Sequence, residues 1–74
     1  MITEELSSGA TKYLVILNAS GNYVKIGQGG QFHGASDLTS KTVIASKEGS
    51  LAANKVSNSS VTMSDLTFAV IKLS

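Results

Sequence analysis

The stretch that decides the fold is Tyr-Leu-Val-Ile-Leu, residues 13–17, which lies among segments rich in Ser, Thr, Gly and Asn. Successive side chains of a β-strand point to opposite faces of its sheet, so this strand has apolar side chains on both faces. The run Phe-Ala-Val-Ile at residues 68–71 has the same character. Both strands therefore need cover on two sides, and we expect them to be central in a sheet.

The rest of the chain offers little material for that second cover. A domain of 74 residues is close to the size at which a single core is marginal, and such chains often rely on disulfides, metal ions or oligomerisation. The sequence contains no cysteine, and His33 alone does not build a zinc site. We therefore predict no metal site and no cofactor, and we expect a homo-oligomer.

The charged residues argue against nucleic acid and membranes as partners. The lysines and acidic residues nearly balance, at a net charge of +1. Arginine, the residue that most often binds guanine and phosphate, is absent. No stretch approaches the roughly 18 to 20 apolar residues that span a bilayer. Residues 1–5, which include Glu4 and Glu5, lack the basic and apolar regions that begin a signal peptide. We therefore expect the protein to assemble where it is made.

Turn residues divide the chain into short segments with strand-like alternation. We predict strands at residues 11–18, 23–26, 41–45, 61–63 and 67–73, with a hairpin turn at residues 19–22. The glycine-rich residues 27–40 predict a long loop anchored by Phe32, and residues 50–56 fit either a short helix or an irregular strand. The pattern indicates an all-β fold, a small antiparallel barrel or sandwich of about five or six short strands.

Residues 1–10 differ from the rest and are predicted to form an N-terminal arm, whereas residues 11–74 form a single β domain. Thr3 is placed to cap one helical turn that contains Glu4 and Glu5 and that Gly9 ends. A helix of this length is not stable alone, so we expect the arm to dock on its own domain or on a neighbour.

The central strands must also be assigned an inner and an outer face. In residues 11–18 the odd-numbered positions form an uninterrupted apolar face, whereas the even-numbered apolar positions are flanked by Lys12 and Asn18. We predict that the uninterrupted face joins the core, which consists of Tyr13, Val15, Leu17, Ala69, Ile71 and Leu73. The surplus apolar residues are then predicted to contact another chain or the arm, because exposed apolar patches usually mark interfaces. These predicted interface residues are Leu14, Ile16, Phe68 and Val70, together with Ile2 and Leu6 of the arm.

No motif in the sequence indicates catalysis. His33 and Asp37 are close enough to pair, but no serine lies in a nucleophile elbow, and the acidic residues are too scattered for a carboxylate pair or a calcium loop. Residues 27–30, Gly-Gln-Gly-Gly, follow a strand as a phosphate-binding loop does, yet neither a Gly-Lys-Ser/Thr motif nor a helix follows them. We therefore predict that the protein is not an enzyme.

The chain as a whole resembles small structural proteins of bacteriophage virions, such as head-decoration or cement proteins and short fibre modules. The likeness rests on small size, on a cysteine-free composition rich in Ala, Ser, Thr, Gly and Asn, and on residues 3–10, 13–23 and 67–74. The resemblance implies a non-enzymatic protein at symmetry-related sites of a capsid or appendage, often as a trimer. Its location would be the virion, after assembly in the host cytoplasm.

Two other functions remain open at this point. A small β-barrel module for single-stranded nucleic acid or glycan is the alternative, and Tyr23 beside Lys25 is its only candidate stacking surface. A minimal hydrolase that uses His33 and Asp37 is the third hypothesis. The loop at residues 27–34 distinguishes a structural protein from a ligand-binding module. In a structural protein we expect this loop to lie against another protein.

Overall fold

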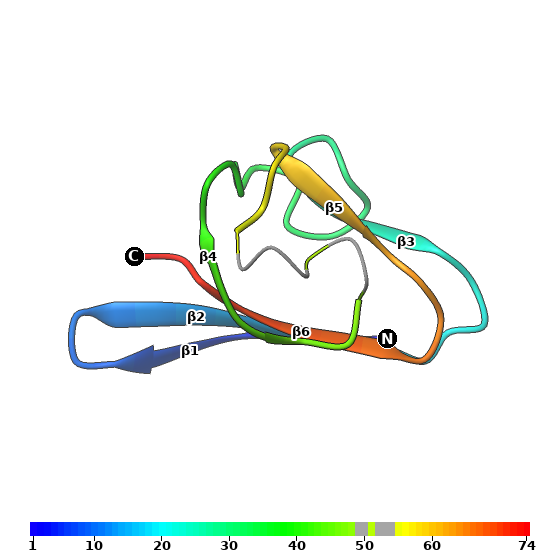
Figure 1. Ribbon diagram of the computed structural model, residues 1–74, viewed down its shortest axis with the longest axis horizontal. Helices are drawn as coiled ribbons and strands as arrows, with labels where there is room; N and C mark the ends of the chain where they lie inside the picture. Colours follow the sequence, from blue (N-terminus) through cyan, green and yellow to red (C-terminus); the bar gives the residue numbers. More distant parts are fainter. Residues whose placement is uncertain (49–50, 52–54) are drawn as a thin grey trace.

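The computed structural model describes residues 1–48, 51 and 55–74, and within them the fold is all-β, as predicted (Figure 1). Two antiparallel sheets lie one over the other without closing into a barrel. The larger sheet has the strand order β1-β2-β6-β4 and the smaller one pairs β3 with β5. The strands are β1 (Ile2–Ser8), β2 (Thr11–Asn18), β3 (Val24–Gly27), β4 (Thr42–Ser46), β5 (Ser60–Met63) and β6 (Thr67–Lys72).

The two strands with consecutive apolar residues, β2 and β6, are the central pair of the larger sheet, which confirms the expectation from sequence. Their register places Leu14 opposite Ile71 and Ile16 opposite Ala69. All four side chains are fully buried beneath the smaller sheet. The complete buried core in the described residues is Leu14, Ile16, Val24, Ile26, Leu38, Val43, Leu51, Val56, Val61, Met63, Ala69 and Ile71.

The inner face of β2 is the opposite of the one predicted. Leu14 and Ile16 are core residues, whereas Leu17 on the other face is largely exposed and Tyr13 and Val15 are half-buried. The prediction is wrong because Asn18, whose polar side chain indicates a solvent-facing position, is fully buried. In β6 the predicted faces are right, since Ala69 and Ile71 point inward, and Leu73 packs partly against the core.

Residues 2–8 form a strand, so the predicted helical turn after Thr3 is wrong. β1 pairs with β2 along its whole length, from Ile2 opposite Leu17 to Ser8 opposite Thr11. Gly9 makes the tight connection, at a φ of 63° that glycine adopts without strain. Seven paired residues stabilise this conformation, whereas a lone helical turn has no such partner.

Residues 19–22 do not form the predicted hairpin, because β2 and β3 belong to different sheets. The turn instead carries the chain from one sheet to the other, and the connection between β5 and β6 crosses beside it. Asn18 joins the two connections: its Nδ2 donates to the carbonyl oxygens of Asn22 at 2.8 Å, Met63 at 3.0 Å and Ser64 at 3.1 Å. The Gly21 N–H adds a bond of 2.9 Å to Oδ1 of Asp65.

The predicted loop between β3 and β4 is present, but its anchor differs. Phe32 is 38% exposed, whereas Leu38 is fully buried and takes the anchoring role assigned to Phe32. Leu38 N–H also donates to the carbonyl of Ser59, which ties the loop to the start of β5. In the segment 50–56, Leu51 and Val56 are buried, and the choice between helix and strand falls on residues outside those described.

Candidate functional site

The face of the larger sheet that points away from β3 and β5, here called the outer face, has three columns of side chains across its strands. Register and alternation define each column in the strand order β1, β2, β6, β4. The first column is Ile2, Leu17, Phe68 and Lys47; the second is Glu4, Val15, Val70 and Ala45; the third is Leu6, Tyr13, Lys72 and Thr42.

The outer face is mostly apolar and is not covered by any described part of the chain. Ile2 is 55% exposed, Leu6 50%, Leu17 44% and Phe68 40%. Ile44, in the β-bulge between Val43 and Ala45 at the β4 edge of the sheet, is also 55% exposed. Single exposed apolar residues are ordinary, whereas a contiguous set on one face of a sheet is typical of an interaction surface.

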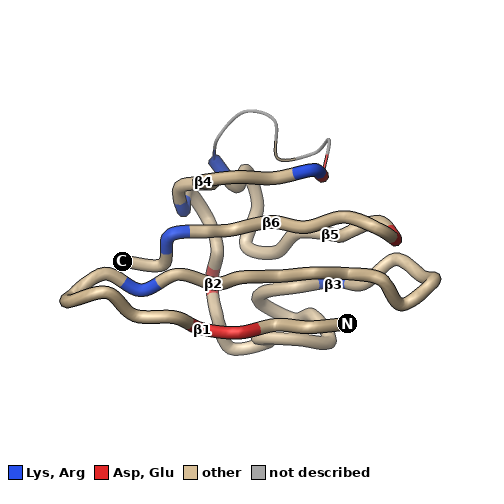
Figure 2. Tube along the Cα trace, turned by 90° about the horizontal axis from the view of Figure 1, so that it is seen from below, with Lys and Arg blue, Asp and Glu red and all other residues tan. Residues whose placement is uncertain are grey.

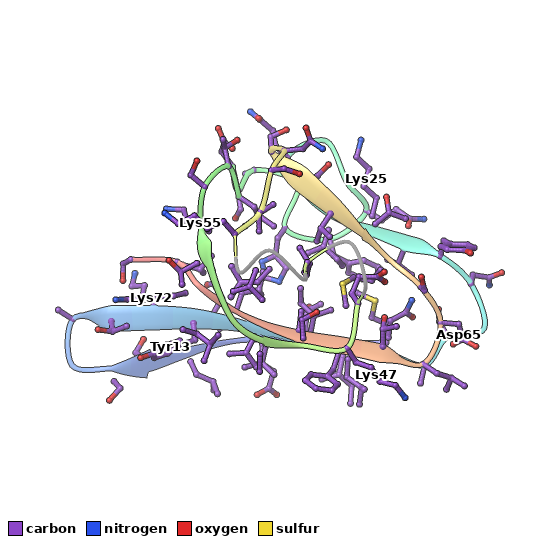
Figure 3. All side chains as sticks on the ribbon, in the orientation of Figure 1. Tyr13, Lys25, Lys47, Lys55, Asp65 and Lys72 are labelled. Atoms are coloured by element: carbon purple, nitrogen blue, oxygen red, sulfur yellow. The ribbon has the colours of Figure 1, made fainter. Side chains whose placement is uncertain are left out.

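Charge is distributed unevenly across the outer face. Figure 2, which views the molecule from this side, shows an acidic segment in the middle of β1 and basic residues at both ends of β4, on opposite edges of the sheet. Register assigns Glu4 to the outer face at the β1 edge and Lys47 to the outer face at the β4 edge. Figure 3 shows Lys47 on the side of the sheet away from β3 and β5.

Four of the six predicted interface residues lie on the outer face: Ile2, Leu6, Phe68 and Val70. Leu14 and Ile16 do not, because both are fully buried in the core and have no surface to offer a partner. The structure replaces them with Val15 and Leu17 from the same strand. Strand pairing is the signal that finds the full set, because it aligns β1 with β2 and so brings Ile2 beside Leu17.

His33 and Asp37 are close enough in sequence to pair, but the hydrogen bonds that Asp37 accepts in the structure come from Thr39. Oδ1 of Asp37 accepts hydrogen bonds from the backbone N–H of Thr39 at 2.9 Å and from its hydroxyl at 2.6 Å. These bonds favour the ionised carboxylate and lower the pKa of Asp37 from its usual value. The carboxylate of Asp37 therefore closes a local turn through Thr39.

The glycine-rich loop satisfies its own backbone groups. The N–H of Gly27 donates to Phe32, that of Gly29 to Gly34 and that of Gly30 to Gly27, at 2.9, 3.1 and 2.8 Å. A phosphate-binding loop directs several free N–H groups at its anion. These three amides are occupied, so the loop lacks that property.

A second surface feature lies on the other side of the molecule. Tyr23 is 74% exposed at the rim of an open pocket of about 480 Å³, and Lys25 points outward from β3 nearby (Figure 3). The pocket is lined by Tyr23, Glu48, Leu51, Val56, Ser57, Asn58, Ser60, Val61, Thr62 and Ser64. Glu48 is engaged there, since its Oε2 accepts the N–H of Ser64 at 2.6 Å.

The part of the chain that the structure describes contains no group of three or more His, Cys, Asp or Glu residues arranged to hold a metal ion. It also contains no helix with the length and apolar character needed to cross a membrane. Comparison with protein-family models, curated proteins and solved structures finds no match to this chain.

Proposed function

We propose that this chain is a non-enzymatic structural protein that packs its outer face against other protein subunits. Its place would be a virion shell, as a decoration or cement protein or a minor capsid component. The observation that carries the proposal is the uncovered apolar face formed by Ile2, Leu6, Leu17, Phe68 and Val70. The resemblance in composition to phage structural proteins supplies the choice of a virion.

The shape of the outer face favours protein over a small ligand. Small molecules bind in concave pockets that bury most of their surface, whereas this face is the open side of a four-stranded sheet with side chains in columns. Burial of apolar area contributes roughly 25 cal/mol per Å². A partner that covers the whole face therefore gains more favourable free energy than a small molecule that covers part of it. A subunit of a larger assembly is such a partner.

The proposal is tested by looking for the chain in assembled particles. Phage particles are purified on a density gradient from the organism that encodes the chain and are analysed by quantitative mass spectrometry. We expect the chain at a fixed high copy number per particle, retained through washes at high salt because apolar contacts hold it. Its absence from the particles, or its loss at moderate salt, would contradict the virion assignment.

A binding module for glycan or single-stranded nucleic acid is the second candidate, and the exposed Tyr23 beside the polar pocket favours it. An aromatic ring next to hydroxyl and amide groups suits the stacking and hydrogen bonding of a sugar or base. Titration with an oligonucleotide at low and moderate salt, and with a panel of oligosaccharides, tests it. We expect no saturable binding; binding that Tyr23→Ala abolishes would support this candidate instead.

A further inference from the structure

We propose that the outer face binds the outer face of a second copy of this chain, about a two-fold axis that runs parallel to the strands. This inference rests on the proposed function, because it takes the outer face as the interface and names its first partner. The observation behind it is that the acidic residue of the outer face, Glu4, lies on β1, whereas its basic residues, Lys72 and Lys47, lie on the β6–β4 half, so opposite charges occupy opposite halves of the face.

The orientation of the axis decides which residues meet. A two-fold axis along the strands, midway between β2 and β6, places β1 of one copy over β4 of the other and β2 over β6. Val15 then lies over Val70 of the second copy, and Leu17 over its Phe68. Glu4 faces the β4 edge of the second copy, where Lys47 is about 7 Å along the strand and within reach of its long side chain.

The other face-to-face arrangement, with the axis perpendicular to the strands, is unfavourable. It places β1 over β1, so Glu4 meets Glu4 of the second copy. The columns are also reversed, which puts the apolar Phe68 over the charged Lys72. The parallel axis avoids the contact between like charges, and it places Lys72 over Tyr13 of the second copy, an aromatic ring with a polar hydroxyl, instead of over Phe68.

The sheet edges are less suited to self-association than the face. Centred antiparallel pairing of β1 with its own copy puts Glu5 opposite Glu5, and like charges directly opposite each other destabilise a strand pair. The β4 edge carries the bulge between Val43 and Ala45, which interrupts regular pairing. Natural sheets use both devices to protect their edges.

The size of the outer face indicates how strongly two copies should bind each other. Strands about 4.8 Å apart and columns about 7 Å apart make a face of roughly 20 Å by 20 Å. Two faces of that size bury roughly 800 Å² in total, which is below the range of stable complexes and within that of weak, transient ones. We therefore expect a reversible dimer whose population rises with protein concentration.

Sedimentation equilibrium of the full chain over a wide concentration range tests the proposal first. We expect a monomer–dimer equilibrium, and Val70→Lys at the centre of the outer face should shift it to monomer. Thr62→Lys on the outer side of β5 is the matched control and should leave the equilibrium unchanged; circular dichroism confirms that both variants fold. A monomer at every concentration, a trimer, or a dimer that survives Val70→Lys overturns the inference.

Charge exchange then tests the axis. Glu4→Lys and Lys47→Glu should each raise the dissociation constant of the dimer about tenfold at low salt, since each places like charges at two symmetry-related contacts. The double variant should return to the wild-type value. A perpendicular axis predicts no effect of Glu4→Lys alone, because one like-charged pair replaces another, and that result overturns the inference.

These outcomes are distinguishable from failure of the proposed function. A chain that is present in particles but monomeric in solution keeps its structural role and loses the dimer. If the chain forms the dimer with the expected response to charge exchange but is absent from particles, the proposed interface stands and the virion assignment fails.

Discussion

Asn18 links the two connections between the sheets, the one from β2 to β3 and the one from β5 to β6, although it lies on the buried side of an apolar strand. Its side chain is fully buried, its Nδ2 donates to three carbonyl oxygens, and its Oδ1 accepts the N–H and hydroxyl of Ser20. A buried amide is tolerated only when such bonds are made. The same residue explains why the faces of β2 were predicted the wrong way round.

Replacement of Asn18 by alanine is expected to lower the free energy of unfolding by about 1–3 kcal/mol, because it removes the Nδ2 donor from the buried bond to Met63 and from two partly buried bonds to Asn22 and Ser64. Asn58→Ala, at an exposed loop position, is the control and should change stability by less than about 0.5 kcal/mol. Urea denaturation of both variants measures the difference. Equal urea midpoints for the two variants would show that the hydrogen bonds of Asn18 do not stabilise the connections between the sheets.

At the scale of elements, the loop that follows β3 depends on the glycine at the last position of that strand. Gly27 has a φ of 105°, and a Cβ there would lie 2.8 Å from the carbonyl oxygen of Ser59, which is a backbone atom and cannot easily move. Gly29, two residues on, also has a positive φ of 76°, but a Cβ there would meet nothing within 4 Å. The two positions share backbone strain and differ in the space around them.

Gly27→Ala should therefore destabilise the protein more than Gly29→Ala. Left-handed strain costs each variant about 1–2 kcal/mol, and the clash adds about 1–3 kcal/mol at Gly27 alone. Thermal unfolding followed by circular dichroism compares them. If Gly29→Ala proved equally harmful, the contact between the loop and Ser59 would not be the cause.

The sequence predicted the elements well and their pairing poorly. Period-two alternation located β2, β3, β4, β5 and β6 within a few residues, because each buries one face. It missed β1, because Glu4 and Glu5 after Thr3 also fit a capped helix. It also placed β2 and β3 in one hairpin, since the turn residues that close a hairpin equally suit a crossing between sheets.

At the scale of the whole molecule, the two sheets are covered unequally. The smaller sheet covers the inner side of β2 and β6, while the outer face keeps its apolar columns exposed. The sequence indicated this surplus correctly, because two strands with consecutive apolar residues exceed what 74 residues can cover. Only the register shows which residues are surplus, since a shift by one residue exchanges the two faces.

The central claim is that the outer face is buried by protein when the chain associates, and the absence of cysteine allows a direct measurement. A single thiol introduced by Val70→Cys reports the accessibility of the face through its rate of alkylation. We expect this rate to fall as protein concentration rises, whereas the rate for Thr62→Cys on the other sheet stays constant. A Val70→Cys rate that does not change with concentration would contradict the account.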